Sequence, residues 1–349
     1  MAHEILSSLA TPALAPADAE ALTALYLRST PANTLRAYER DLLYITAWKR
    51  AAFGAPLEWP EREEVALRFI LDHSRGLEEA GEDPARATAM ALIRAGLRKS
   101  LACPAPATLD RRISSWRSFH RMKNLASPFE APLLRQARMK GRRAVAHRAR
   151  RKSANPITRE VLEAMLATCD NSLRGIRDRA VLMLGWASGG RRRSELAGLM
   201  RADISLADYP ADGVIWLALV ETKTTRRGQT PRLVLKGRAA EALAFWVEAA
   251  PVTDGPLFRP ITRNDDALER ALSPDGIYQI VQKRLLAAGY PKGFATPHGL
   301  RSGFLTQAAL DGAPIQAAMR LSLHRSVAQA QLYYDDVEIK ENPAADLLG

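Results

Sequence analysis

Cysteine is scarce in this sequence of 349 residues, which contains only two. Cys103 and Cys169 stand far apart, and neither has a CxxC motif or a cysteine–histidine cluster near it. A disulfide framework and a structural zinc site are therefore not indicated. Because disulfides are typical of oxidising compartments, this composition favours the reducing cytoplasm.

Long apolar runs are also missing. The first residues, MAHEILSSLATPALAP, lack the basic region and the continuous apolar core of a secretory signal, and no later run approaches membrane-spanning length. We therefore expect a soluble, intracellular protein without a membrane partner. Its apolar fraction of 47% is that of a globular protein, and its length suits two domains of ordinary size.

Acidic residues are absent from one segment, RMKGRRAVAHRARRK, which spans residues 138 to 152 and carries a charge of +8. The whole chain carries +12, whereas residues 1 to 137 hold 18 Lys/Arg against 16 Asp/Glu, and residues 153 to 349 hold 24 against 22. A concentrated excess of cations indicates a polyanionic partner such as nucleic acid. We interpret the segment as an interdomain linker that lies against phosphates, and the alternative is an ordinary solvated linker.

The residues before this linker follow a helical pattern. TPANTLRAYERDLLYITAWKRAA repeats apolar residues at helical spacing behind residues able to cap, and GEDP and CPAP breaks separate later segments. The predicted helices, which make a small bundle, span residues 30–52, 61–80, 84–102 and 108–124. The last of them carries basic side chains that either contact DNA or simply face solvent: Arg111, Arg112, Arg117, Arg121 and Lys123.

The residues after the linker mix helix and strand. IRDRAVLMLGWAS, residues 176–188, predicts a buried helix that stops at Gly189 and Gly190, and RSELAGLM predicts a second one. VIWLALVETK and TPRLVLKG, residues 214–223 and 230–237, are β-rich runs joined by a polar turn, which is a hairpin signature. Further helices are predicted over residues 238–250, 274–288, 297–311, 314–323 and 326–335. The fold class is thus mainly α with a small antiparallel β-sheet.

Four motifs that carry chemistry follow one another in this half. GGRRRSEL places Arg192 three residues before Glu195, and ETKT places Lys223 at the end of a strand. TPHGLRSG contains an HxxR pair, His298 and Arg301, which lie one helical turn apart and so share a face. By itself an HxxR pair is a weak signal, because His147 and Arg150 form another one in the linker.

The last motif is LHRSVAQAQLYYDD, in which His324 precedes Tyr333 by nine residues. Taken in order, the four motifs resemble the tyrosine recombinase or phage integrase family, whose pattern runs Arg, Lys, HxxR, His or Trp, then Tyr. The family spacing between that histidine and the nucleophile selects Tyr333 over Tyr334. LSLH departs from the LGH that family members commonly show.

The first family box has an arginine followed at plus two and plus three by a small residue and an acid. Arg192, Ser194 and Glu195 fit this frame, whereas Arg191 and Arg193 do not. The resemblance covers most of the chain, because NTLRAYERDL and TLDRRISSWRSFHR look like the family's core-binding domain.

By resemblance, the catalytic residues are Arg192, Lys223, His298, Arg301, His324 and Tyr333, with Glu195 in support of Arg192. Two guanidiniums suit the nonbridging oxygens of a phosphodiester, and histidines can hydrogen-bond the phosphate or take the tyrosine's proton. The resemblance gives Lys223 the task of protonating the leaving oxygen, although Arg226 and Arg227 stand in the same hairpin. It implies a covalent 3′-phosphotyrosine without metal, ATP or other cofactor, and the chain has neither a Walker motif nor a carboxylate metal cluster.

The resemblance also implies an organisation: a core-binding domain over residues 1–137, a basic linker over 138–152 and a catalytic domain over 153–349, which together clamp a DNA duplex. It implies double-stranded DNA as partner, a tetramer on two paired sites, accessory DNA-bending proteins and a place at the nucleoid. We expect DNA contacts from Arg111, Arg112, Arg142, Arg143, Arg148, Arg150 and Arg151. The expected function is site-specific recombination, and the alternatives are a type IB topoisomerase or an inactive DNA-binding regulator of a mobile element.

Overall fold

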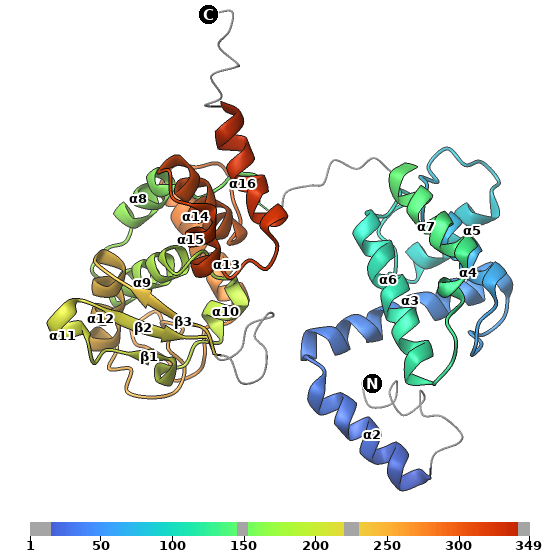
Figure 1. Ribbon diagram of the computed structural model, residues 1–349, viewed down its shortest axis with the longest axis horizontal. Coiled ribbons are helices and arrows are strands. Elements are labelled where there is room, and N and C mark those ends of the chain that lie inside the picture. The colour runs from blue at the N-terminus through green and yellow to red at the C-terminus, as the bar shows by residue number, and fades with distance from the viewer. Residues whose placement is uncertain (1–14, 145–152, 220–229, 341–349) are drawn as a thin grey trace, which may run out of the picture. The chain divides into compact units, whose positions relative to one another are not determined.

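The computed structural model describes residues 15–144, 153–219 and 230–340. The chain divides into two compact units, Met1–Arg150 and Arg151–Gly349 (Figure 1). Each unit has its own hydrophobic core. No described helix is long and apolar enough to cross a membrane. The predicted class, mainly helical with a small antiparallel sheet, is confirmed.

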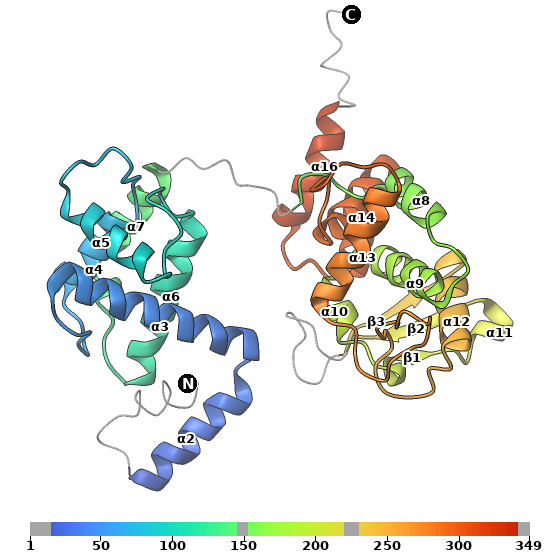
Figure 2. The same ribbon diagram turned by 180° about the vertical axis from the view of Figure 1, so that it is seen from behind.

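The first unit is helical throughout its described part (Figure 2). Proline at the first helical position begins four of its helices, where the missing N–H costs nothing. Its core gathers apolar faces from several helices, and Trp48, Phe69 and Trp116 are fully buried there. The elements are α2 (Pro16–Ser29), α3 (Ala32–Phe53), α4 (Glu63–Asp72), α5 (Pro84–Arg94), α6 (Pro106–Met122), the short 3-10 turn η1 (Pro128–Glu130) and α7 (Pro132–Ala144).

Helices α4 and α5 are shorter than their sequence patterns predict. The backbone N–H of Leu77 donates to the carbonyl of Leu101 at 3.0 Å, so the segments that follow the two helices pair with each other. Helix α4 ends at Asp72. Helix α5 ends at Arg94 because Gly96 adopts φ of +70° and the N–H groups of Leu97 and Arg98 turn back to the carbonyl of Leu92, at 2.9 and 3.2 Å. Neither α2 nor α7 was among the predicted helices.

Helix α7 changes the interpretation of the basic segment. Residues 138–144, which the charge pattern assigned to the linker, form the last turns of α7, which packs against α4. Arg138 Nε donates to Asp110 Oδ1 of α6 at 2.6 Å, which ties this part of the segment to the first unit. These residues belong to the first unit and not to a linker because α7 is anchored by the buried Leu134 and continues as a helix to Ala144. Residues 145–152 lie outside the described residues.

The second unit contains a three-stranded antiparallel sheet of order β1–β2–β3 at one end (Figure 1). Ile204 of β1 pairs with Leu217 of β2, and Trp216 of β2 pairs with Val234 of β3. Helix α9 packs against both α12 and α14, and so joins the sheet side of the core to the helices that follow (Figures 1 and 2). The predicted hairpin is present as β2 and β3, whereas β1 and α8 were not predicted.

The elements of this unit that precede the hairpin turn are α8 (Arg159–Ala167), α9 (Leu173–Ala187), α10 (Arg193–Ala197), η2 (Arg201–Asp203), β1 (Ile204–Ser205), α11 (Tyr209–Asp212) and β2 (Ile215–Ala218). Those that follow it are β3 (Arg232–Leu235), α12 (Arg238–Ala249), α13 (Pro274–Ala287), α14 (His298–Leu310), α15 (Ile315–Ser322) and α16 (Val327–Lys340).

Candidate active site

A pair of glycines ends α9 and brings three distant segments together. Gly189 and Gly190 have φ of +93° and +73°, a backbone region that side chains disfavour. A Cβ on Gly190 would lie 2.2 Å from Cα of Arg301, and one on Gly189 would lie 2.3 Å from the carbonyl carbon of Leu321. The turn therefore contacts α14 and the end of α15 with bare backbone, which sets the position of the arginines that follow.

Arg192 stands at the start of α10, next to Glu195. Its Nη1 donates to Glu195 Oε1 at 2.6 Å, and its backbone N–H donates to Oε2 at 3.1 Å. The carboxylate is buried, while the Arg192 side chain is 37% exposed. Glu195 thus fixes one edge of the guanidinium and leaves the rest of it accessible.

Arg301 lies on the first turn of α14, one turn after His298. It is almost completely buried, and its Nη1 donates to the carbonyl of Gly190 at 3.2 Å. Its Nε and Nη2 lie 3.3 and 3.2 Å from Nε2 and Nδ1 of His324. Burial, with the neighbouring charges of Arg191 and Arg192, lowers the pKa of Arg301 to about 10, so it remains a cation at neutral pH.

His324 follows α15 and faces these cations. Burial lowers its pKa to about 4, and the charges of Arg301, Arg192, Arg191 and His298 act in the same direction. The ring is therefore neutral at neutral pH. Because a guanidinium has only donors, one ring nitrogen of His324 accepts from Arg301, and the other lies within reach of a further partner such as Ser322 Oγ, 2.8 Å from Nδ1.

The two adjacent tyrosines of α16 point to different surroundings. The hydroxyl of Tyr333 lies 3.4 Å from Nε2 of His298, and its ring centroid lies 6.3 Å from that of His324. Tyr334 is buried against α14 and α15, and its hydroxyl donates to the carbonyl of Ala313 at 3.0 Å. Neighbouring helical residues point about 100° apart, so only one of the pair can face the cluster of histidine and arginine.

Five of the sequence-predicted catalytic residues therefore come together from four places in the second unit. Arg192 lies at α10, His298 and Arg301 on α14, His324 after α15, and Tyr333 on α16. Lys223, with its neighbours Arg226 and Arg227, lies outside the described residues. Among the described residues, no group of three His, Cys, Asp or Glu side chains could hold a metal ion.

Arg191 is a site residue that sequence reasoning set aside. Its guanidinium is 1% exposed, donates from Nη2 to the carbonyl of Leu321 at 2.7 Å and lies 3.8 Å from Glu195 Oε2. The three consecutive arginines after the glycine pair were a visible signal. A linear motif does not say which of three neighbouring arginines is buried, so the family frame alone left Arg191 unassigned.

The predicted DNA contacts of the first unit lie in varied surroundings. Arg112 is stacked on the ring of Tyr44, with Cζ 3.3 Å from the ring centroid, and burial lowers its pKa. Arg111 is half-exposed and bound by Asp41 of α3. Arg142 is 67% exposed, 3.6 Å from Asp110, and Arg143 is exposed. Arg148, Arg150 and Arg151 lie outside the described residues.

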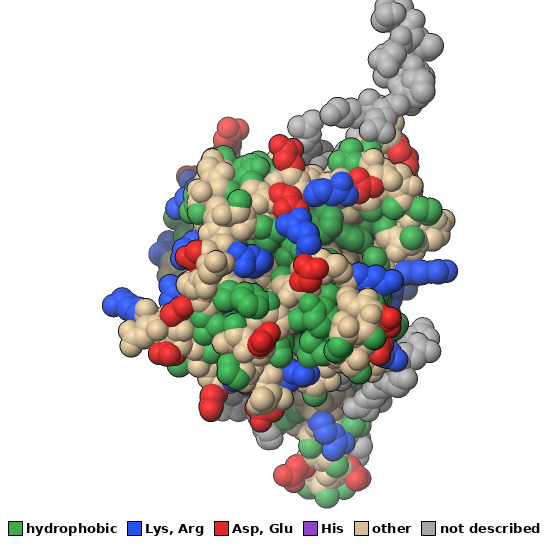
Figure 3. Space-filling model, turned by 90° about the vertical axis from the view of Figure 1, so that its left-hand side faces the viewer, with side chains coloured by type: hydrophobic (Ala, Val, Ile, Leu, Met, Phe, Trp, Pro, Cys, Tyr) green, Lys and Arg blue, Asp and Glu red, His purple; other side chains and the backbone are tan. Residues whose placement is uncertain are grey.

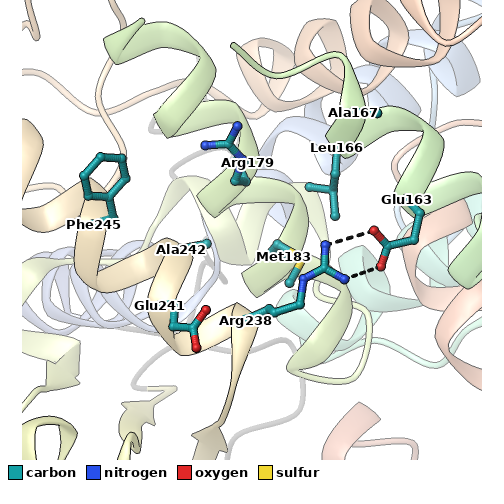
Figure 4. A pocket seen from close by; sticks show the side chains of 9 residues that line it. All are labelled: Glu163, Leu166, Ala167, Arg179, Met183, Arg238, Glu241, Ala242 and Phe245. Carbon is teal, nitrogen blue, oxygen red and sulfur yellow. Dashed lines mark hydrogen bonds and ion pairs between the residues drawn. The ribbon is translucent and has the colours of Figure 1, made fainter. Parts of the chain in front are cut away.

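A separate hollow in the second unit contains none of these residues. It lies between α8, α9 and α12, where Leu166, Met183 and Phe245 line it and Arg238 binds Glu163 through two hydrogen bonds of 2.6 and 2.9 Å (Figure 4). The surface on the side of α8, α11 and α12 mixes acidic, basic and hydrophobic side chains (Figure 3). A face with interspersed charges of both signs does not suit a polyanion.

The fold and the site define a mainly helical protein that gathers arginines, histidines and a tyrosine at one place. The model of the phage integrase family matches residues 155–338. The chain therefore belongs to the phage integrase family, that of the tyrosine recombinases, and is an enzyme of site-specific DNA recombination that cleaves and rejoins DNA.

Individual relatives agree with this family. The chain is 27% identical over 326 residues to an integrase/recombinase XerD homologue of Selenomonas ruminantium, covering 90% of this chain and 85% of that protein. It is 31% identical over 194 residues to tyrosine recombinase XerD of Xanthomonas campestris pv. campestris, covering 51% of this chain and 54% of that protein.

Solved structures show the same fold at lower identity. The XerH site-specific recombinase in a post-cleavage complex with difH substrate is 15% identical with a TM-score of 0.53, covering 95% of this chain and 84% of that one. The Tn1549 transposon integrase in complex with transposon right-end DNA is 14% identical with a TM-score of 0.53, covering 93% of this chain and 98% of that one.

Proposed function

We propose that this protein recombines specific duplex DNA sites through a covalent 3′-phosphotyrosyl intermediate, with Tyr333 as the nucleophile. The observation that carries the proposal is the 3.4 Å distance between the Tyr333 hydroxyl and His298 Nε2. A free phenol has a pKa of about 10, so at neutral pH it attacks only when a neighbouring group takes its proton. His298 lies where such a group is needed. Catalytic hydrogen bonds of this length commonly tighten when substrate binds.

Arg192 and Arg301 would hold the scissile phosphate. A phosphodiester under attack gathers negative charge on its nonbridging oxygens, and guanidiniums meet such oxygens with paired N–H groups. The accessible edge of Arg192 and the cation of Arg301 supply those donors, while His324 is neutral and accepts a hydrogen bond from Arg301, whose guanidinium it helps to orient. Glu195 holds Arg192 in place.

The bond changes follow from these positions. The Tyr333 oxygen bonds to phosphorus as the phosphorus–O5′ bond breaks, and the phenol proton passes to His298. Lys223, on the segment between β2 and β3, gives a proton to the departing 5′ oxygen, leaving a free 5′-hydroxyl. Because the phosphotyrosyl ester keeps the energy of the broken linkage, a 5′-hydroxyl from a second strand reverses the steps without ATP or metal.

The partner we propose is double-stranded DNA, held by both units. The core-binding domain, predicted over residues 1–137, would extend through residue 144 because α7 continues to that point, and residues 153–349 would form the catalytic domain. The XerH and Tn1549 integrase structures, solved with DNA, support this choice. The basic run at 138–152 would lie along the phosphate backbone between them. Two paired sites bound by a tetramer, with accessory DNA-bending proteins, complete the proposed assembly.

The test uses a nicked suicide duplex cut from the DNA that flanks the gene, in a buffer that contains EDTA. The wild-type protein should form a covalent adduct that survives SDS, and Tyr333→Phe should bind the same duplex without forming it. Two copies of the site should be joined, while an arbitrary supercoiled plasmid is relaxed poorly. Relaxation of any plasmid would support a topoisomerase instead, and specific binding without cleavage would support a regulator.

A further inference from the structure

Arg191 keeps a full charge in a place that almost no solvent reaches. Its side chain is 1% exposed, and its Nε has no hydrogen-bond partner among the described residues. Burying a guanidinium with an unsatisfied donor is unfavourable, and an apolar side chain of similar length would avoid that cost. The contacts that Arg191 makes therefore indicate why a cation stands here.

The carbonyl that Arg191 binds belongs to the turn that presents His324. Leu323, between them, has φ of +54° and ψ of +39°, a left-handed conformation unfavourable for a residue with a Cβ. The side chains of Leu321 and Leu323 pack on the core of the unit, and Ser322 is fully buried beside His324. We define residues 321–324 as the histidine turn. Its backbone is strained, so contacts from outside it must hold it in place.

Arg191 links this turn to the other half of the site. Along the chain it is adjacent to Arg192, and its Nη1 lies 3.8 Å from the same carboxylate, Glu195, that fixes Arg192. On its other side, Nη2 holds the carbonyl of Leu321 at 2.7 Å, across 130 positions of sequence. One buried guanidinium thus connects the turn that carries Arg192 with the turn that carries His324.

We propose that Arg191 is a positioning residue for the cleavage reaction, which locks the histidine turn against the Arg192 turn so that both face one phosphate. This inference rests on the proposed function of the site and extends it to a residue that touches no reacting atom. The charge of Arg191 has a second effect, because it disfavours a proton on His324. The other groups that face His324 are Arg301 and His298 from α14, Arg192, Ser322 and the ring of Tyr333.

Two substitutions test these contacts. Arg191→Met keeps a side chain of similar length and removes the hydrogen bond to Leu321 together with the charge, whereas Arg191→Lys keeps the charge and one donor group. On the nicked suicide duplex, Arg191→Met should slow adduct formation by about 10- to 100-fold, the cost of a displaced catalytic group, with duplex affinity within about twofold of wild type. The acid limb of its rate–pH profile should move to higher pH, because His324 takes up a proton more readily. Arg191→Lys should stay within about tenfold of wild type and keep the acid limb in place.

Arg284→Met is the matched control. Arg284 is also buried, and it binds Asp178 at 2.6 and 2.8 Å and the carbonyl of Thr168, away from the site residues. Its loss should lower the melting temperature without moving the acid limb. A wild-type rate and acid limb in Arg191→Met would overturn the proposal, and so would an equal shift of the limb in Arg284→Met.

A second measurement does not depend on catalysis. Amide hydrogen exchange of residues 321–324 should be faster in Arg191→Met than in wild type and close to wild type in Arg191→Lys, and the His324 ring should titrate at higher pH in Arg191→Met. Unchanged exchange and titration would refute the positioning role even if cleavage were slow. A wild-type protein that forms no adduct at all would refute the proposed function, while the exchange result would still decide the role of Arg191.

Discussion

The hydroxyl of Tyr333 lies 3.4 Å from Nε2 of His298, although the two residues are 35 positions apart in sequence. The contact joins the first turn of α14 to the middle of α16, which pack against each other. On the same stretch of α16, the Tyr334 hydroxyl donates a hydrogen bond to the Ala313 carbonyl and so stabilises the fold of the second unit. Adjacent residues of one type therefore have different surroundings, so the same substitution should affect them in different ways.

Tyr334→Phe should retain covalent cleavage but lower stability. It removes one buried hydrogen bond and leaves the Ala313 carbonyl without this donor, which costs about 1 kcal/mol. Tyr333→Phe should show the opposite pattern, with no adduct and a stability close to wild type, because among the described residues its hydroxyl makes one long contact, with His298. Urea unfolding and the suicide duplex measure the two effects. Loss of the adduct in Tyr334→Phe alone would reverse the assignment.

Gly190→Ala should damage the site more than its backbone conformation alone explains. A positive φ costs an alanine about 1 kcal/mol, and here the new Cβ would also meet Cα of Arg301 at 2.2 Å. We expect a loss of at least about 3 kcal/mol in unfolding free energy, typical of severe steric conflict, together with slower cleavage.

Gly213→Ala is the control that separates the cost of a positive φ from the cost of a steric clash. Gly213 has φ of +64°, similar to Gly190, but nothing lies within 4 Å of a Cβ built there. The Gly213→Ala variant should therefore lose only about 1 kcal/mol in unfolding free energy and should cleave DNA at the wild-type rate. Equal losses in the two variants would mean that Gly190 is needed for its φ alone, and not for the approach to Arg301.

Acid should destabilise the second unit through His324. Its folded pKa of about 4 lies below the ordinary 6.5, so between these values the unfolded chain binds a proton that the folded chain excludes. The contribution to stability is fully present above about pH 6.5 and is lost as the pH falls toward about 4. The melting temperature of wild type should fall more steeply over this window than that of His324→Gln. His73 of the first unit, whose pKa burial lowers to about 3, is common to both proteins and cancels in the comparison. Parallel curves would show that His324 is protonated as readily in the folded state as in the unfolded one.

The basic segment should contribute to DNA affinity without contributing sequence specificity. Replacing Arg142, Arg143, Arg148, Arg150 and Arg151 with glutamine should weaken binding to specific and random duplexes by similar factors. Each phosphate contact adds about 0.9 to the log–log salt slope, so the slope should flatten by about two to four if most of the five touch phosphate. Cleavage at saturating protein should survive, because the site residues remain. A selective loss at the specific site would mean that some of these arginines read base edges.

Arg238→Gln is the single-residue control for Arg142→Gln. Both side chains are about two-thirds exposed, but Arg238 is bound by both oxygens of Glu163 and lies at the hollow between α8, α9 and α12 (Figure 4). Arg142→Gln should reduce the salt slope by up to about 0.9, and Arg238→Gln should leave it unchanged. Equal reductions would show that the slope reports overall charge and not contact along the basic segment.

The sequence alone determined the fold class, the order of the motifs and the elements that carry them. Periodicity predicted α3, α6, α9, the hairpin and the helices after it, because each of these signals lies within a few turns of chain. Elements whose limits depend on distant partners were missed or misjudged. α4 ends at Asp72 and α5 at Arg94, well short of the predicted limits, and α7 extends into a segment whose charge suggested a linker.

Within the site, the sequence singled out residues, and the tertiary structure decided what each of them touches. Spacing pointed to Tyr333, but only the packing of α16 on α14 shows its hydroxyl beside His298. Three consecutive arginines look alike in a linear motif. The structure buries Arg191 against a carbonyl 130 positions away, while Arg192 remains accessible and Arg193 faces solvent. Burial, hydrogen bonding and the pKa of His324 arise from segments that meet only in the folded chain, so no local pattern could determine them.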